Sequence, residues 1–423
     1  MQSKAAEVIQ RCRQLAQITD VAGETTRLFL SNATKEAHRL LTRWMCAAGL
    51  QVRTDDIGNL RGWRSGPTPT SPTLLLFSHI DTVPNAGPFD GCLGILASLA
   101  VLEAFRGKPL PFAIELIAFS EEEGVRFGWP FLGSRAAVTC VSDADLERKD
   151  EAGESVADAL AAFGLSARQI GSTCPIPSNT FAAIEIHIEQ GPVLEHLDHS
   201  IGVVDAIIGQ SHLEVTFEGT ANHAGTTPMK LRSDALAAAA DWIGKVERYA
   251  SNREPLVATV GCVHAKPNAV NVIPGLVDLM LDVRHRNSRT RHRAIHTFME
   301  MAKVSGTRRG VQFTVFSHTE QPSVAMDAKL TRQLLEASSF AGHQAHVLSS
   351  GAGHDAMILA PFIPTALLFV RSPGGLSHHP DETVREQDVQ AALETVEAFV
   401  ESLHPLKTVS SPPLELERGM PNG

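Results

Sequence analysis

The chain has 423 residues, of which 43% are hydrophobic and 20% are charged, and its formal net charge at pH 7 is −10. One hydrophobic core usually stops growing below this length, so we expect a globular chain with two domains. The acidic balance argues against a nucleic-acid or membrane partner. The sequence has no apolar stretch as long as a membrane span, and its six cysteines lack any C-x-x-C spacing, so we expect a cytoplasmic protein with reduced thiols.

Apolar runs alternate with stretches of helical periodicity along most of the chain. An amphipathic helix is predicted at the N-terminus. Strands are predicted at residues 74–77, 113–120, 182–188 and 365–370, and helices at residues 94–105, 330–340 and 384–403. This alternation is typical of an α/β fold with a largely parallel sheet.

The middle of the chain has a different order of elements. Strands are predicted at residues 212–218, 257–265, 276–284 and 311–316, and helices at residues 230–250 and 288–304. Two strand-helix-strand halves indicate an inserted α+β domain. We therefore expect a discontinuous first domain at residues 1–207 and 323–405 and an insert at residues 208–322. The tail at residues 406–423 is polar and rich in proline and glycine, which predicts disorder.

The first predicted strand is followed by the polar turn SHIDTVPNAGPFDG, which contains His79, Asp81 and Asp90. Ligands of α/β sheets bind beyond the carboxyl ends of the strands, so the position of these side chains favours a functional site. A structural alternative is that the two aspartates cap local turns and that His79 is an ordinary loop histidine.

The second strand runs into the acidic sequence SEEEGVRF, in which Glu121, Glu122 and Glu123 are adjacent. Three neighbouring carboxylates at the end of a buried strand repel one another unless a cation or protons compensate their charge. This favours a metal site, and the alternative is a solvated acidic turn.

Two further clusters contain histidines. In EIHIEQG, strand alternation puts Glu185, His187 and Glu189 on one face, where His187 is either a metal ligand or an ordinary sheet histidine. In GGLSHHPD, His378 and His379 are adjacent, and we expect only one of them to be a ligand because neighbouring loop side chains usually point apart. Imidazole and carboxylate ligands suit Zn²⁺, Mn²⁺ or Co²⁺, and one aspartate can bridge two ions, so the four clusters together indicate a water-activating metal centre.

Ten motifs of the chain resemble, in the same order, those of the dinuclear-metal amidohydrolases that contain allantoate amidohydrolase, N-carbamoyl-L-amino-acid hydrolase and β-ureidopropionase. They are FSHIDTVPN, PFDG, EEGVRF, LGSRA, EIHIEQGPVLE, ANHAGTTPM, NxIPG, LDVR, SGAGHDA and LSHxP. The resemblance extends from about residue 27 to about residue 403. It implies an α/β catalytic domain like that of metallo-exopeptidases, with a mixed, mostly parallel sheet, and an inserted ferredoxin-like dimerisation or lid domain.

The resemblance also implies a metal centre with two divalent ions per subunit. These would be Mn²⁺ or Zn²⁺, with Co²⁺ or Ni²⁺ as alternatives. The implied ligands are His79, His187 and the bridging Asp90 for one ion, and Asp90, Glu123 and His378 for the other. Peptidase relatives usually carry an acidic ligand at the position of His187, so this histidine favours the branch that cleaves ureido groups. Whether His379 joins the site is left open.

The resemblance assigns further roles around these ligands. Glu122 matches the general base, which takes a proton from the attacking water and passes it to the leaving nitrogen. Asp81 matches the carboxylate that orients His79. His223 matches a histidine that reaches into the active site of a partner subunit and stabilises the oxyanion, which implies a homodimer. Without the resemblance, the structural alternative for His223 is a turn histidine that caps the helix after Pro228.

The implied substrate contacts are Gln190, His223, Asn271, Arg284, Gly353 and His354. Arg284 would hold the substrate carboxylate through its planar guanidinium, although a strand-end ion pair is the structural alternative. Closure of a hinge near residues 208 and 322 would assemble these contacts.

The implied activity is hydrolysis of the ureido (N-carbamoyl) group of a small carboxylate, with release of ammonia and carbon dioxide. The pair EEGVRF and LGSRA favours allantoate as the substrate. N-carbamoyl-L-amino-acid hydrolase and β-ureidopropionase are the alternatives, and an aminoacylase or dipeptidase is a more distant one.

Overall fold

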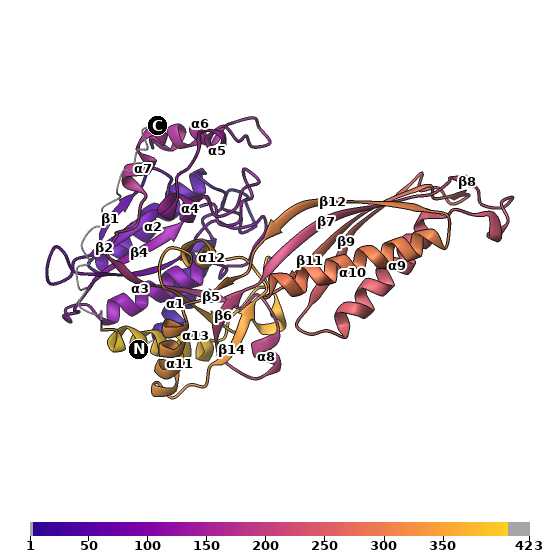
Figure 1. Cartoon of the computed structure of the whole chain (residues 1–423). Helices are drawn as coiled ribbons and strands as arrows, with labels where there is room; N and C mark the ends of the chain where they lie inside the picture. Colours follow the sequence, from indigo (N-terminus) through magenta and orange to yellow (C-terminus); the bar gives the residue numbers. More distant parts are fainter. Residues whose placement is uncertain (1–2, 405–423) are drawn as a thin grey trace, which may run out of the picture.

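The computed structural model describes residues 3–404, apart from the side chains of residues 317–319. The disorder expected at residues 406–423 lies outside the described residues. The chain folds into two parts that lie end to end, and each is named after its sheet. The nine-stranded layer is rounded and consists of a nine-stranded sheet with its helices. The four-stranded layer, a four-stranded sheet with its helices, is elongated and projects from the first (Figure 1).

The nine-stranded sheet is parallel at its centre and mostly antiparallel toward its edges, with one further parallel pair there. Its spatial order is β1 (Gln51–Thr54), β2 (Leu60–Arg64), β4 (Ala113–Phe119), β3 (Thr73–His79), β5 (Thr180–Ile188), β15 (Thr365–Val370), β6 (Ile201–Ile207) and β13 (Val324–Ala325), with β14 (His346–Ser350) pairing with β6. The central strands β4, β3, β5 and β15 are parallel neighbours. The pairs β1–β2, β2–β4, β15–β6 and β13–β6 are antiparallel. The parallel character expected from the sequence therefore holds where both faces of the sheet are buried.

Helices cover both faces of this sheet. They are α1 (Lys4–Ala16), α2 (Asn32–Ala47), α3 (Cys92–Ala104), α4 (Leu132–Val138), α5 (Asp143–Leu146), α6 (Val156–Phe163), α7 (Ile170–Thr173), α8 (Val193–His196), α11 (Ala328–Phe340), α12 (Asp355–Leu359) and α13 (Glu386–Ser402), with short 3-10 turns η1 (Ala167–Gln169) and η3 (Pro373–Gly375). None of the described helices has the length and apolar character needed to cross a membrane.

Helix α3 is the most deeply buried of these helices, with residues 92–102 all inside the core. Its outer side packs against α1 and α13, and its inner side packs against β3 and β5. A Cβ at Gly94 would lie 1.9 Å from the backbone oxygen of Ile186 on β5. Only glycine therefore allows the first turn of α3 to approach β5 this closely, and this turn directly follows Asp90.

The four-stranded layer has its own core. Its strands are β7 (Gly209–Glu218), β9 (Val257–Lys266), β11 (Leu276–His285) and β12 (Gln312–Gln321), all antiparallel in the order β12-β7-β11-β9, and its helices are α9 (Ala235–Ser251) and α10 (Ser288–Thr307). The βαββαβ order is that of a ferredoxin-like layer, as expected. Trp242 on α9 and Phe298 on α10 are fully buried in this core, and the indole of Trp242 donates a hydrogen bond to the backbone oxygen of Phe298 at 2.8 Å. At the far end, β8 (Asn222–His223) pairs with β10 (Val272–Ile273).

Two predicted boundaries in this layer are wrong by five residues. The strand expected to end at residue 316 continues to Gln321. The helix expected to begin at residue 230 begins at Ala235, because the side chain of Asp234 accepts a hydrogen bond from the backbone nitrogen of Ala237 and caps the helix there. The preceding residues form the separate 3-10 turn η2 (Met229–Leu231), which begins after Pro228.

Replacing Gly94 tests the close approach of α3 to β5. Gly94→Ala should lower the free energy of unfolding by at least ~2 kcal/mol, because the new methyl group overlaps the backbone of β5. Urea unfolding followed by tryptophan fluorescence measures this change. Gly171→Ala is the control, since a Cβ at this helical position meets nothing within 4 Å. Equal unfolding midpoints for the two variants would contradict the prediction.

Candidate metal centre

The four polar clusters of the sequence meet at one edge of the nine-stranded sheet. His79 ends β3, and His187 is the penultimate residue of β5. Glu123 follows β4, and His378 lies in the segment that follows β15. Because these four strands are parallel neighbours, the segments that leave their carboxyl ends converge.

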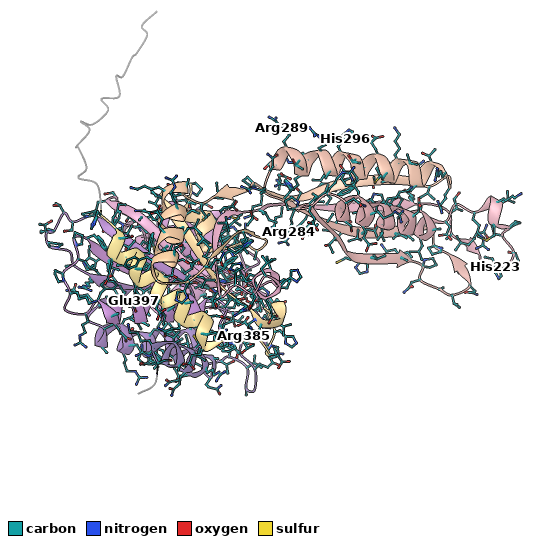
Figure 2. The ribbon with its side chains drawn as sticks, turned by 90° about the horizontal axis from the view of Figure 1, so that it is seen from below. His223, Arg284, Arg289, His296, Arg385 and Glu397 are labelled. Atoms are coloured by element: carbon teal, nitrogen blue, oxygen red, sulfur yellow. The ribbon has the colours of Figure 1, made fainter. Side chains whose placement is uncertain are left out.

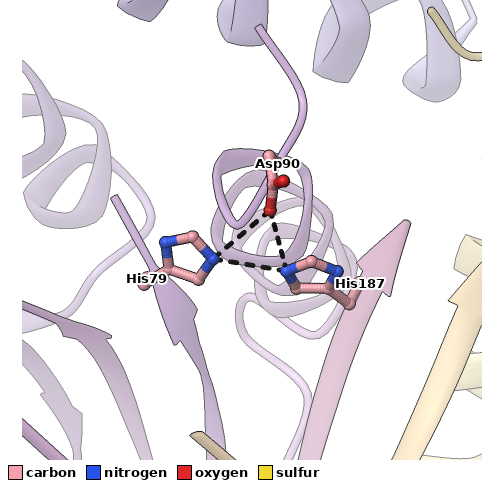
Figure 3. A group of neighbouring side chains, drawn as sticks. All are labelled: His79, Asp90 and His187. Carbon is pink, nitrogen blue, oxygen red and sulfur yellow. Dashed lines mark hydrogen bonds and ion pairs between the residues drawn. The ribbon is translucent and has the colours of Figure 1, made fainter. Parts of the chain in front are cut away.

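Three side chains form the first group, shown in Figure 3. Oδ1 of Asp90 lies 3.5 Å from Nε2 of His79 and 3.2 Å from Nε2 of His187, and the two nitrogens are 3.3 Å apart. All three side chains are buried, and no described residue donates a well-aligned hydrogen bond to Oδ1. These separations suit three ligands that each lie ~2.0–2.2 Å from a shared ion. The group therefore fits a divalent cation.

The other oxygen of Asp90 faces a second group. Nε2 of His378 lies 3.3 Å from Oδ2 of Asp90 and 3.5 Å from Oε1 of Glu123. The two carboxylate oxygens of Asp90 are thus divided between the two groups. This is the arrangement expected of a carboxylate that bridges two ions.

Backbone oxygens orient the imidazoles of the first group. Nδ1 of His79 lies 3.1 Å from the backbone oxygen of Asp81, and Nδ1 of His187 lies 2.9 Å from that of Ile188. Donation from each Nδ1 leaves Nε2 free to bind a cation. The Asp81 carboxylate is 3.7 Å from His79, and its Oδ2 accepts a hydrogen bond from the backbone nitrogen of Glu123 at 3.0 Å. Asp81 therefore connects the segments after β3 and β4.

The charges of the cluster are poorly compensated by the protein itself. Burial, together with the nearby charge of Asp90, raises the pKa of Glu123 to about 8. Burial also raises the pKa of Glu122 well above its usual value, although His79 acts in the opposite direction. Burial raises the pKa of Asp90 too, but the imidazoles that face it more than offset this and hold its pKa well below the usual range. A bound cation would let all these carboxylates ionise together, so the electrostatics agree with the geometry.

Glu122 lies beside both groups. Its Oε2 is 3.9 Å from Nε2 of His79, and its side chain is almost fully buried. Glu121 points elsewhere, because its Oε1 accepts hydrogen bonds from the backbone nitrogens of Arg126 and Phe127 and closes the turn. The acidic triplet thus divides into a turn residue, a carboxylate that faces His79 beside the centre, and a potential ligand.

Two other residues of the histidine clusters, His379 and Glu189, bind elsewhere. His379 is half exposed, and its Nδ1 accepts a hydrogen bond from the backbone nitrogen of Asp381. The sequence pattern placed Glu189 on the same face as His187, which is wrong because β5 ends at Ile188. Both carboxylate oxygens of Glu189 instead accept hydrogen bonds from the first backbone nitrogens of α8.

Sequence reasoning missed two residues next to Asp90. The hydroxyl of Ser377 donates a hydrogen bond to Oδ2 of Asp90 at 2.8 Å, and Glu382 accepts one from the backbone nitrogen of Asp90 at 3.0 Å. Both residues flank His378 in the segment LSHHPDE, and this closeness to a predicted ligand could have identified them from the sequence. Gln190, which the resemblance did indicate, donates a third hydrogen bond to Asp90, at 2.8 Å to Oδ2.

His354 and Gly353 lie behind the first group. The imidazole of His354 is buried, packs 4.4 Å from the ring of His187, and lies 2.9 Å from the hydroxyl of Ser350. Gly353 is exposed, and a Cβ there would lie 2.8 Å from the ring of Phe131. In this conformation His354 therefore supports His187, and the exposed surface at this point belongs to Gly353.

Arg284 lies at the narrow junction between the two layers (Figure 2). Its guanidinium donates hydrogen bonds to the carboxylate of Asp282 and to the backbone oxygen of Gly351, at 2.8 and 2.7 Å. Arg284 and Gln190 line the same cavity of about 1060 Å³, with walls from both layers. The cavity therefore connects the edge of the metal centre to a cation that can bind a carboxylate.

His223 and Asn271 lie at the opposite end of the four-stranded layer, where Figure 2 shows His223 at the tip. Both residues are exposed, and the backbone oxygen of Asn271 accepts a hydrogen bond from the backbone nitrogen of Ala224 at 2.9 Å. The fold of one chain therefore separates them from Asp90 and Arg284.

Comparison with known proteins identifies the family of this chain. The sequence profile described as peptidase family M20/M25/M40 matches residues 75–402. The chain is 36% identical to a probable allantoate deiminase of Oryza sativa subsp. japonica, over 91% of this chain and 86% of that protein. It is 37% identical to an N-carbamoyl-L-amino-acid amidohydrolase of Pseudomonas sp. (strain NS671), over 86% of this chain and 89% of that protein.

A solved structure agrees with these sequence relationships. The crystal structure of an amidase of the hydantoinase/carbamoylase family from Burkholderia multivorans has a TM-score of 0.88 and 31% identity, and covers 94% of this chain and 97% of that chain. The expected fold and the expected family resemblance are confirmed. The chain belongs to peptidase family M20/M25/M40 and, within it, to the group of amidohydrolases that these relatives represent.

Proposed function

We propose that this enzyme hydrolyses the ureido group of a small carboxylate, releasing ammonia and carbon dioxide, and that allantoate is its preferred substrate. The observation that carries the proposal is the division of the two Asp90 oxygens between two imidazole and carboxylate groups, with Glu122 beside them. Relatives named for allantoate and for N-carbamoyl-L-amino acids match about equally well. The EEGVRF and LGSRA motifs favour allantoate, and N-carbamoyl amino acids, including N-carbamoyl-β-alanine, are the alternative substrates.

The proposed centre holds two divalent ions, one at each group of ligands. His79, Asp90 and His187 would hold one ion, and Asp90, Glu123 and His378 the other. Mn²⁺ or Zn²⁺, with Co²⁺ or Ni²⁺ as alternatives, would polarise the ureido carbonyl and lower the pKa of a water.

Glu122 is the proposed general base. Its carboxylate is buried next to the centre, and among the described residues His79 is its ion-pair partner. It would accept a proton from the attacking water and deliver it to the nitrogen that leaves the carbonyl carbon. A raised pKa, caused first by burial, suits both halves of this task.

The substrate carboxylate would bind Arg284, which would exchange its bond to Asp282 or Gly351 for a bidentate carboxylate pair. We propose that the layers are domains with boundaries near residues 208 and 322, and that their closure over the cavity brings Arg284 toward Gln190 and the substrate. The exposed edge around Gly353, in front of His354, would contribute to the same surface.

We further propose that the enzyme is a homodimer. His223 and Asn271 are exposed at the end of the four-stranded layer, separated from the metal centre of their own chain. From a partner subunit they would reach the substrate, where His223 would donate a hydrogen bond to the oxyanion.

The six free cysteines, three of which are exposed, agree with a reducing, cytoplasmic location.

A substrate panel tests the proposed reaction. Metal-stripped protein should be inactive, and reloading with Mn²⁺ should restore ammonia release that is at least ~10-fold faster from allantoate than from N-carbamoyl-L-amino acids or N-carbamoyl-β-alanine. Faster release from a carbamoyl amino acid would contradict allantoate as the preferred substrate but would agree with the proposed hydrolysis of a ureido group. Hydrolysis of N-acetyl amino acids alone would contradict the ureido proposal.

Comparing variants of two adjacent glutamates distinguishes the general base from a metal ligand. Glu122→Gln should lower kcat by about 10²–10⁴-fold while both ions stay bound, because only the proton acceptor is lost. Glu123→Gln, the same change one residue later, should remove one ion. Rates of ammonia release and metal content by mass spectrometry distinguish the two. Wild-type kcat in Glu122→Gln would exclude the assigned base.

Complementation between inactive variants tests the proposed dimer. If His223 acts across the interface, co-expressed His223→Ala and Glu122→Gln chains form mixed dimers with one intact site, and activity returns to about a quarter of the wild-type value. Each variant expressed alone should remain inactive. His264→Ala, which changes an exposed histidine on β9 of the same layer, should keep full activity. Absence of recovery in mixed dimers would place His223 outside the partner's site.

A further inference from the structure

The carboxylate of Asp90 has two different environments. Oδ1 faces His79 and His187 and has no well-aligned donor among the described residues. Oδ2 accepts hydrogen bonds from the amide of Gln190 and the hydroxyl of Ser377, each at 2.8 Å. These two donors fix the rotation of the carboxylate, so that one oxygen points to each group of ligands.

Glu382 holds the backbone of Asp90 in place. Its Oε1 accepts hydrogen bonds from the backbone nitrogens of Phe89 and Asp90, at 2.9 and 3.0 Å. Its Oε2 lies 3.3 Å from the hydroxyl of Ser377, whose single hydrogen is donated to Asp90 at the shorter distance. The side chain is only 4% exposed. A Cβ at Gly87 would lie 2.2 Å from Cβ of Glu382, so a glycine is needed for the two segments to pack this closely.

These contacts also hold the segment that carries His378. Ser377 and Glu382 lie on either side of His378 and bind the Asp90 segment, which is almost 300 residues away in the sequence. The side chain of His378 is 48% exposed, whereas the side chain of His79 is 1% exposed and is held by its strand. The position of His378 therefore depends on these tethers much more than that of the histidines in the first group.

We propose that Ser377 and Glu382 are positioning residues for the second ion of the centre. They divide the oxygens of Asp90 between the ions and keep His378 within reach of Asp90 and Glu123. The inference rests on the two-ion centre proposed above. The strands β3 and β5 hold His79 and His187 of the first group in place. Loss of either tether should therefore lower the affinity for the second ion and leave the affinity for the first unchanged.

Metal titration of the full-length protein tests this inference without reference to activity. Stripped wild-type, Ser377→Ala and Glu382→Ala proteins are titrated with Mn²⁺ by calorimetry, and the magnetic coupling between two Mn²⁺ ions is followed by electron paramagnetic resonance. In both variants, binding of the weaker ion should fall by about 10- to 100-fold and the coupled signal should be lost at limiting Mn²⁺, while the tighter ion binds within about twofold of wild type.

Two features make the outcome decisive. Glu386→Gln, an exposed carboxylate change four residues after Glu382, should bind both ions as the wild type does. Retained affinity for the tighter ion shows that each variant is folded. Equal loss of both ions, or unchanged binding of both, would overturn the positioning role. A wild-type protein that binds fewer than two ions would instead overturn the two-ion centre, and the inference with it.

Discussion

The buried carboxylate of Asp90 is the group on which the rest of the site depends. A charge this deep in a protein is costly unless opposite charges and hydrogen bonds surround it, and here imidazoles, an amide and a hydroxyl all face it. Its two oxygens serve different partners, so any rotation of the carboxylate would damage both groups. The neighbouring segments are therefore arranged around this one side chain.

The core of the nine-stranded layer holds Asp90 in place. The residue lies between the end of β3 and the start of α3, and α3 is buried on all sides. Gly94 lets the helix approach the backbone of β5, the strand that carries His187. The same contact therefore packs α3 tightly against β5 and sets the position of Asp90 relative to His187.

The four-stranded layer has a hydrophobic core separate from that of the nine-stranded layer. It has a core of its own around Trp242 and Phe298, and it projects from the nine-stranded layer as an arm. Arg284 lies at the base of the arm and His223 at its tip. One arm can therefore contribute to its own site at the base and, in the proposed dimer, to a second site at the tip.

The sequence by itself determined the α/β class, because apolar periodicity marks buried strands. It also indicated a ligand site through the polar clusters that follow such strands, whereas the choice of ligands within the clusters came from the family resemblance. Only the tertiary structure decided which members of each cluster meet. Glu121 and Glu189 bind local backbone nitrogens, and His379 turns outward, although each lies beside a residue of the centre in the sequence. Ser377 and Glu382 gain their importance from contacts with a segment almost 300 residues away, and no local pattern encodes such a contact.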